Sequence, residues 1–438
     1  MKDMKESITY PLNAIQWEAY DEFMEDPHLT QHNTAVCMPF ERSSAQRFAR
    51  AMQKMLDEHR YLHIHLVRQG DEIMICEDWQ MPNNVHYLRM SDAEWEAAKP
   101  TFTKPFDAFN EACVRLYLVE TDTQCNVIME CFHLFFDGIS HRALWNAFEE
   151  AVQGLPLYQQ GDIAAEITYR EIASYNSEAY CRAKEYYLKK FKGLQLTDYC
   201  RETDNPMGPA ISAHPMVSAT IIDEGCQRIG QTPTTVFFAA YALALAYMSG
   251  ETRVVFYTVN HGRSDRRLTD HVYGHYLSSL PIVIDTDPNQ TVAELLSQTR
   301  SEIFCSMRYR IYPEYHLLRD LGIECIEGDA TEIGYTAVNI PEYINIDGKL
   351  WPTYHIDPSF TGEHSSTYIT RREDLYEVYT DCSSALYTQE QIDIMSGITG
   401  KMALLLVGDQ NETLNNIIPN KKDEKNIISG LRQYRPCL

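Results

Sequence analysis

The sequence has few basic residues and no long apolar run. Its 38 Lys and Arg residues are outnumbered by 62 Asp and Glu residues, which gives a formal net charge of −24 at pH 7. A surface this acidic repels the phosphates of nucleic acids and of anionic membranes, so we expect neither as a partner. The chain also lacks a run of about 18 apolar residues and an N-terminal signal-peptide core. We therefore expect a cytoplasmic protein.

Cysteines at metal-binding or redox spacing are also lacking. The 12 cysteines are scattered from Cys37 to Cys437, with no CxxC pair and no Cys/His cluster at zinc-ligand spacing. We expect them to be reduced and mostly buried, and we expect no bound metal. The sequence contains no GxSxG, GxGxxG, GxxxxGK[ST] or HExxH motif. These absences argue against serine hydrolases of the elbow type, nucleotide-binding enzymes and zinc peptidases.

What is present indicates a globular chain with two lobes. Hydrophobic residues make up 44% of the chain and charged residues 23%, which is typical of proteins with a sizeable core. A length of 438 residues exceeds one ordinary core. A polar segment near residue 200 suggests the boundary, so we predict one lobe over residues 1–195, a second over 196–420, and a tail or linker over 421–438. Helical and strand patterns occur in both halves, which predicts a mixed α+β or α/β class built as a two-layer sandwich. The patterns predict strands over residues 61–67 and 333–340, a helix over about 172–191, and a buried helix that Thr232-Pro233 begins and Gly250 ends.

The hydrophobic period changes around His133. Residues 112–119 and 127–132 are β-prone runs separated by a polar turn, which predicts two adjacent strands. From Ser140 onward, apolar residues recur at helical spacing. His133 therefore lies between a strand and a helix, which is a common place for reactive groups.

Two interpretations of His133 fit this pattern. In the first, it is a half-buried imidazole beside a capped helix. In the second, the imidazole, with an ordinary pKa near 6.5, accepts a proton from an attacking amine or alcohol as a general base. Gly138 would then let backbone approach closely, and Asp137 would be an anchor. A buried carboxylate needs a hydrogen-bonded cation, and we predict that Arg263 pairs with Asp137.

A cysteine nucleophile is the weaker alternative. Cys131 lies two residues before His133. Residues two apart in a strand share a face, but they are not placed for proton transfer along it.

Several segments resemble, in order, the motifs of the condensation domains of nonribosomal peptide synthetases. These domains are similar to a wider group of acyltransferases that includes chloramphenicol acetyltransferase. Residues 132–140 match the pattern HHxxxDGxS, and the resemblance spans nearly the whole chain. The matching segments are Tyr10 to Gln16, Lys104 to Asp107 with Arg115, Phe132 to Ser140, Thr232 to Arg263, and Gly274 to Pro281.

The resemblance implies a fold of two chloramphenicol-acetyltransferase-like lobes arranged in a V as a pseudo-dimer. It implies that His133 acts on the acceptor amine in a tunnel, that Gly138 offers its backbone near the oxyanion, and that Asp137 with Arg263 forms a structural salt bridge. No bound cofactor is implied, because phosphopantetheine arms of carrier proteins deliver donor and acceptor. We expect a monomer with carrier proteins as its partners.

Two departures from the family pattern stand out. The first His of the motif is Phe132, which we expect to support the motif by packing on the strand. We expect Ser140 to support the motif as well. The Asn-Thr of the later GxFxNT segment is Ser278 and Ser279, which we expect on the tunnel or acceptor side together with Asn339. The second departure indicates a different acceptor, a different linkage or reduced activity.

Three functions follow. The first is formation of an amide between a carrier-bound acyl or aminoacyl thioester and an amine. The second is acyl transfer to a soluble amine or alcohol. The third is a catalytically silent module that docks carrier proteins. We also predict a basic docking patch around Arg182, Lys184, Lys189 and Lys190.

Overall fold

Contacts within the chain divide it into two units. The first comprises Met1–Ser177, His261–Leu277 and Val338–Ser359, and the second comprises Glu178–Asn260, Ser278–Ala337 and Phe360–Leu438. The structure is a computed structural model. It describes residues 6–28, 30, 32–194, 199–201, 203, 205–323, 331–335, 342–356, 360–362 and 364–418.

A five-stranded sheet with the order β15-β2-β7-β6-β5 forms the frame of the first unit. The predicted pair of adjacent strands is confirmed, because β6 and β7 are antiparallel with Val114 opposite Cys131. A three-stranded sheet, β1-β4-β3, and a hairpin, β13-β14, complete its strands. Their bounds are β1 (Ile8–Pro11), β2 (Asn33–Phe40), β3 (Ile64–Gln69), β4 (Glu72–Glu77), β5 (His86–Arg89), β6 (Val114–Glu120), β7 (Cys125–Phe132), β13 (Tyr343–Ile346), β14 (Lys349–Pro352) and β15 (Tyr354–Ile356).

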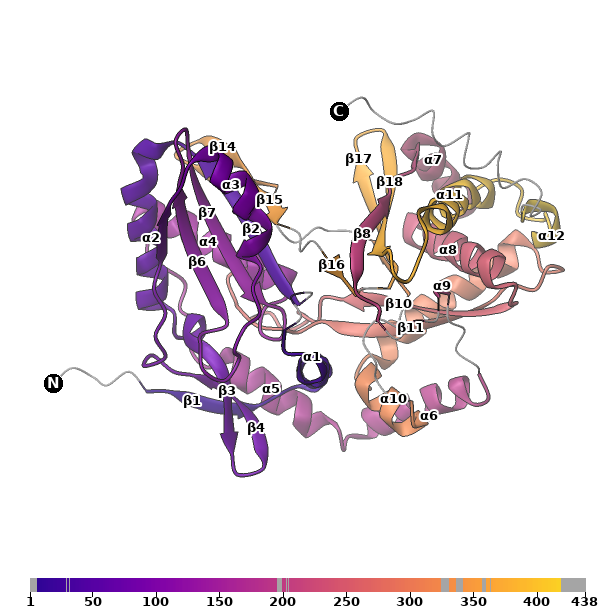
Figure 1. The fold of residues 1–438 in the computed structure, drawn as a ribbon. Helices are drawn as coiled ribbons and strands as arrows, with labels where there is room; N and C mark the ends of the chain where they lie inside the picture. The colour runs from indigo at the N-terminus through magenta and orange to yellow at the C-terminus, as the bar shows by residue number, and fades with distance from the viewer. Residues whose placement is uncertain are drawn as a thin grey trace. The chain divides into compact units, whose positions relative to one another are not determined.

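Helices cover both faces of the five-stranded sheet (Figure 1). Successive residues of a strand point to opposite faces. Met129 accordingly packs in a core that includes Phe148, whereas Ile128 packs in a separate cluster with Trp95. The helices of this unit are α1 (Ala14–Glu25), α2 (Ala45–Glu58), α3 (Asp92–Ala98), α4 (Gly138–Gln153) and α5 (Ile163–Ser174).

The second unit contains an eight-stranded sheet with the order β11-β10-β12-β17-β18-β8-β16, to which β9 adds by pairing with β18. β10 and β11 are antiparallel over their full lengths, and β12 is parallel to β10. The bounds are β8 (Gly208–Ala213), β9 (Met216–Ser218), β10 (Arg253–Asn260), β11 (Ser278–Asp285), β12 (Glu332–Tyr335), β16 (Phe360–Thr361), β17 (Ser366–Arg372) and β18 (Leu375–Ser383).

Helices also cover both faces of this sheet. Phe256 of β10 packs in the core that holds α8 and α11, whereas Tyr257 packs in a cluster with α6 and α10. The predicted caps of α8 are confirmed, since Thr232 caps its first turn, Pro233 begins it, and Gly250 ends it with a φ of 79°. The helices are α6 (Glu178–Phe191), α7 (Ala219–Ile229), α8 (Pro233–Ser249), α9 (Val292–Tyr309), α10 (Glu314–Leu321), α11 (Gln389–Leu406) and α12 (Leu414–Ile417).

The predicted mixed class is confirmed, but two predicted elements are wrong in extent. The helix expected from about residue 172 to 191 is two helices, α5 and α6, separated by residues 175–177. Asn176 and Ser177 compete for backbone hydrogen bonds through their side chains, which favours a break. The strand expected from Tyr61 starts at Ile64, because Arg60–His63 form a 3₁₀ turn. Residues 336–340 of the strand expected near Ile333, and the tail over 421–438, lie outside the described residues.

Within the described ranges, no single helix is long and apolar enough to cross a membrane. The bent pair α7 and α8, with 105° between its members, passes the same test by length and composition.

Candidate active site

His133 lies directly after β7, in the turn that leads to α4. Its backbone N–H donates to the carbonyl of His32 at 2.7 Å. Its half-buried ring packs edge-to-face against the ring of His275, with centroids 4.7 Å apart and planes at 70°. The strand end and this ring contact therefore fix the position of His133.

Asp137 caps the N-terminus of α4 and faces away from solvent. Its Oδ1 accepts a hydrogen bond from the backbone N–H of Ser140 at 2.7 Å. The Ser140 hydroxyl lies 2.8 Å from the same oxygen and shares its single proton between Asp137 and the Gly274 carbonyl. The same oxygen accepts from Nη2 of Arg263 at 2.8 Å. The exposed fractions of the Asp137 and Arg263 side chains are 0% and 3%. Asp137 thus uses its charge inside the protein rather than toward a substrate.

Arg263 makes further contacts through both of its Nη atoms. Nη1 donates to the carbonyls of Thr269 and Val272 at 3.1 and 2.8 Å. Nη2 also donates to the Ser140 hydroxyl at 3.0 Å, and the guanidinium lies over the Tyr276 ring at 5.0 Å. A buried ion pair is stable only with such additional partners. We call Asp137, Ser140 and Arg263 the clamp.

The clamp holds residues 261–277, which we call the return segment because they rejoin the first unit from the second half of the chain. Ser140 donates to the Gly274 carbonyl at 2.6 Å, and Asp137 accepts from the Tyr276 N–H at 3.3 Å. Gly262, at φ 65°, lies so close to Tyr276 of the same segment that a Cβ there would be 1.5 Å from the Tyr276 carbonyl oxygen. Only glycine fits that approach.

The other predicted residues near His133 take different roles. Phe132 is buried, and its ring packs on Phe23, Phe106 and Phe135 at centroid distances of 5.4, 5.7 and 6.1 Å. Gly138 is the first residue of α4. Its N–H therefore belongs to the first turn, where backbone amides point toward the helix N-terminus.

The predicted acceptor-side residues lie elsewhere. Ser278 and Ser279 begin β11 in the second unit, opposite Asn260 and Val259 of β10. Asn339 lies outside the described residues. The structure thus brings together His133, Asp137, Gly138, Ser140 and Arg263 in the first unit.

The sequence reasoning missed His275 and Asn13. Asn13 caps α1 and its side-chain amide donates to the His275 carbonyl at 2.9 Å, across 262 positions of sequence. The available signal was a histidine in the otherwise apolar and aromatic run around Tyr273 and Tyr276. The imidazole of a histidine in such a run is expected to be buried with its neighbours.

Cys131 does not have the properties of a nucleophile. It is fully buried, and burial, followed by the nearby charge of Glu130, holds the pKa of its thiol well above the ordinary value. The reactive form of cysteine is the thiolate, which this site disfavours. In the part of the chain that the structure describes, no group of three or more His, Cys, Asp or Glu side chains is arranged to hold a metal ion.

The predicted basic patch on α6 stays a prediction, and acidic partners lie against three of its four cations. Lys190 pairs with Glu302, and burial lowers the pKa of its ammonium to about 8. Lys184 pairs with Asp320 at 2.6 Å. Arg182 pairs with Glu178 one helical turn earlier. These pairs follow from the excess of acidic residues over the whole chain.

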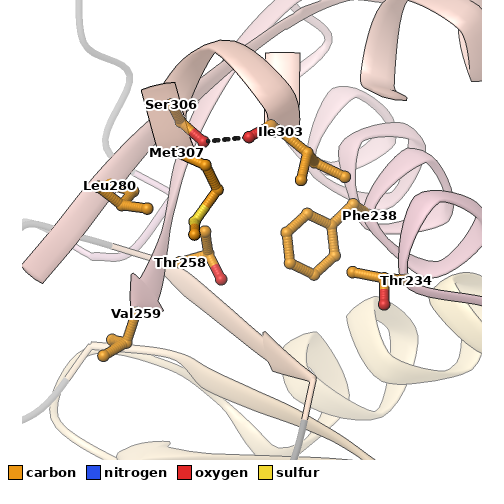
Figure 2. Close-up of a pocket in the computed structure, with 8 residues that line it drawn as sticks. All are labelled: Thr234, Phe238, Thr258, Val259, Leu280, Ile303, Ser306 and Met307. Atoms are coloured by element: carbon orange, nitrogen blue, oxygen red, sulfur yellow. Dashed lines mark hydrogen bonds between the residues drawn. The ribbon is translucent and has the colours of Figure 1, made fainter. Parts of the chain in front are cut away.

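The second unit contains a small pocket between α8, α9 and the β10-β11 pair (Figure 2). Its volume is about 170 Å³. The Ser306 hydroxyl on its wall donates to the carbonyl of Ile303 at 2.9 Å. Apolar cavities of similar size hold small apolar molecules, so this pocket suits an apolar group but supplies no acid or base. Its lining residues are Thr234, Phe238, Thr258, Val259, Leu280, Ile303, Ser306 and Met307.

Comparisons with solved structures define the class of fold. The first condensation domain of the calcium-dependent antibiotic synthetase superposes with a TM-score of 0.75 and 13% identity, covering 94% of this chain and 98% of that one. The condensation domain of the monacolin K polyketide synthase superposes with a TM-score of 0.75 and 14% identity, covering 93% and 99%. The chain thus has the fold of these condensation domains.

The sequence comparison supplies the family. The family model for the condensation domain matches residues 6–332, and the chain belongs to this family. Tyrocidine synthase 2 from Brevibacillus parabrevis is 23% identical over 326 residues, which cover 72% of this chain and 9% of that protein. The chain therefore spans less than a tenth of this relative's length. Condensation domains are the acyltransferases of nonribosomal peptide synthetases and form amide bonds.

Proposed function

We propose that this chain joins a carrier-bound acyl or aminoacyl thioester to an amine acceptor, with His133 as the general base. The observation that carries the proposal is the geometry of the strand-to-helix turn. His133 is half-buried at the end of β7, while Asp137, four residues later, is wholly engaged by the clamp. Of His133 and Asp137, the imidazole is therefore the group that we propose handles the proton of a reacting group.

The proposed reaction balances as follows. The acceptor nitrogen attacks the thioester carbonyl carbon, and a C–N bond forms as the carbonyl oxygen takes negative charge. His133 accepts the proton lost by the nitrogen. The C–S bond then breaks, and the sulfur leaves as a thiol with that proton. The products are an amide and a free carrier thiol.

Gly138 has a separate role in this proposal. An oxyanion is stabilised by a backbone N–H that is fixed before the reaction begins. The N–H of Gly138 lies in the first turn of α4, which Asp137 caps through Ser140. The clamp thus fixes one end of the short turn between His133, the proposed base, and Gly138, the proposed oxyanion donor.

The partners in this proposal are carrier proteins that present donor and acceptor on phosphopantetheine arms. The domain itself needs no bound cofactor, and we propose that it acts as a cytoplasmic monomer of two lobes. Ser278 and Ser279, where the family has Asn-Thr, would contact the acceptor side. An acceptor other than the family's usual aminoacyl group is compatible with this exchange.

The test is mass-spectrometric detection of products from a panel of carrier-bound acyl donors, offered with carrier-bound and free amines and alcohols. The parent chain is compared with His133→Ala, and with His28→Ala as the control for an exposed histidine of the same unit. Amide that requires His133 and a carrier-bound acceptor supports the proposal. Product from free acceptors alone identifies a soluble-acceptor acyltransferase. Carrier binding with no product from any donor identifies a silent docking module.

A further inference from the structure

A second imidazole lies against His133 and comes from the return segment. His275 is 4% exposed and contacts the His133 ring edge-to-face at 4.7 Å. In the described part of the chain, neither of its ring nitrogens has a hydrogen-bond partner of normal geometry. Buried polar atoms are usually paired, and the backbone contact with Leu134, which falls outside normal hydrogen-bond geometry, does not by itself account for an imidazole at this place.

The backbone around His275 is fixed from three directions. Asn13, itself 2% exposed, donates to the His275 carbonyl at 2.9 Å. The carbonyl of Gly274 accepts from Ser140, and the N–H of Tyr276 donates to Asp137. The backbone of each residue from 274 to 276 therefore makes a hydrogen bond to a residue of the first unit that lies outside the return segment. The clamp sets the place of the His275 ring.

His275 is held neutral, and a neutral ring does not repel the positive charge that a neighbouring base gains when it accepts a proton. Burial holds its pKa well below the ordinary value, and the positive charge available to His133 acts in the same direction. The other groups that act on the ring are His32 and Arg263, which also lower the pKa, and the backbone of Leu134, which opposes them. Two adjacent imidazoles do not both ionise readily. His275 is therefore the ring of this pair that stays neutral.

We propose that His275 is a positioning residue for His133, whose ring it holds in one orientation while remaining neutral itself. The inference rests on the proposed role of His133 as the base. It gives the clamp a function beyond stability, because the clamp fixes the segment that carries His275. It also supplies a second imidazole at a site where Phe132 replaces the first histidine of the family motif, although from a different part of the chain.

The test uses His275→Ala, which removes the ring, and His275→Phe, which keeps an aromatic ring. The control is His63→Ala, which removes another buried histidine of the first unit, packed on Trp79 at 5.5 Å. For folded protein, we expect His275→Ala to lower kcat about 10- to 100-fold with KM nearly unchanged, since misplaced catalytic groups cost that much. His275→Phe should recover most of kcat, and His63→Ala should keep the parental value.

A double-mutant cycle separates positioning from independent damage. If His275 acts through His133, then adding His275→Ala to His133→Ala should cause no further loss of rate. NMR of the imidazole nitrogens gives a readout without turnover, because the His133 signals should shift in His275→Ala and stay in place in His63→Ala.

Parental kcat in His275→Ala, an equal loss in the His133→Ala background, or unchanged His133 signals would each overturn the inference. Failure of the proposed function looks different, since either the parent chain would then form no product or His133→Ala would be fully active.

Discussion

Arg263 donates a hydrogen bond of 2.8 Å to Asp137, which lies 126 positions earlier in the sequence. Both side chains are buried, and both belong to the first unit. Since Asp137 also caps α4, this one pair links the helix after His133 to the return segment that carries His275. The turn that carries His133 is thus supported by a charge pair that itself takes no part in the proposed chemistry.

Breaking this pair should destabilise the first unit strongly. Asp137→Asn or Arg263→Ala leaves a buried group without its partner, which costs about 3–5 kcal/mol. Arg47→Ala, which breaks an exposed pair with Asp347, should cost less than about 1 kcal/mol. Urea unfolding of the three variants measures the difference, and equal losses would contradict a special role for the buried pair.

The close approach of the return segment predicts an asymmetry between two glycines. Gly262→Ala puts a Cβ against the Tyr276 carbonyl, so the segment must shift, and we expect a loss of at least about 3 kcal/mol. Gly161 has a similar φ of 58° but open space around its Cβ position. Gly161→Ala should therefore cost only the backbone strain, about 1–2 kcal/mol. Thermal melts compare the two, and the crowding account fails if Gly161→Ala is as damaging.

Phe132 should not tolerate a return to histidine. The change would bury an imidazole among three phenylalanine rings, and an unpaired polar group in such a place costs about 1–3 kcal/mol. We expect Phe132→His to lower stability and to leave product formation per folded molecule no higher than in the parent. Phe132→Leu, which buries no polar atom, should cost less. A more active Phe132→His variant would show that the missing histidine matters.

Mild acid should unfold the first unit because it buries neutral histidines. Burial lowers the pKa of His59 to about 4 and that of His141 to about 3. In the unfolded chain these rings take up protons below about pH 6.5, whereas the folded state resists them until its own lower pKa. Each ring thus removes about 1.4 kcal/mol of stability per pH unit as the pH falls within that window.

Substitution of His141 tests this slope. Between pH 6.5 and pH 4.5, His141→Gln should reduce the fall in unfolding free energy by up to about 1.4 kcal/mol per pH unit, which is the contribution of one proton. The exposed His28→Gln should leave the slope unchanged. Tryptophan fluorescence reports on the relevant part of the chain, because all five tryptophans lie in the ranges of the first unit. An unchanged slope in His141→Gln would mean that this ring is not held neutral.

Local signals predicted much of the fold and part of the site. The strand before His133 and the helix after it followed from periodicity, and the caps of α8 followed from Thr-Pro and Gly. The contact between Asp137 and Arg263 was expected because a buried carboxylate needs a cation, and the structure shows that contact. The strand, the helix and the caps depend on residues that are close in sequence, and the ion pair depends on the large cost of burying an unpaired carboxylate.

The remaining features depend on contacts that periodicity does not encode. The ring contact of His275 with His133 joins distant segments. It depends on hydrogen bonds from the Asn13 side chain and the clamp to the backbone of residues 274–276, and these leave no repeating pattern in the sequence. The break between α5 and α6 was missed because the helical pattern continues on both sides of it. The acidic partners of Lys184 and Lys190 lie on other helices, so the side chains appeared unpaired in sequence alone.

The first unit is built from three separate stretches of chain, and this has a consequence during synthesis. Arg263 is made 126 residues after Asp137, which at ribosomal rates of about 5–20 residues per second is about 6–25 s later. For that interval the nascent first unit holds a carboxylate without its guanidinium and a His133 without His275. His133 can therefore reach its final surroundings only after the chain has begun to make the second unit, so the two halves of the protein mature together rather than in turn.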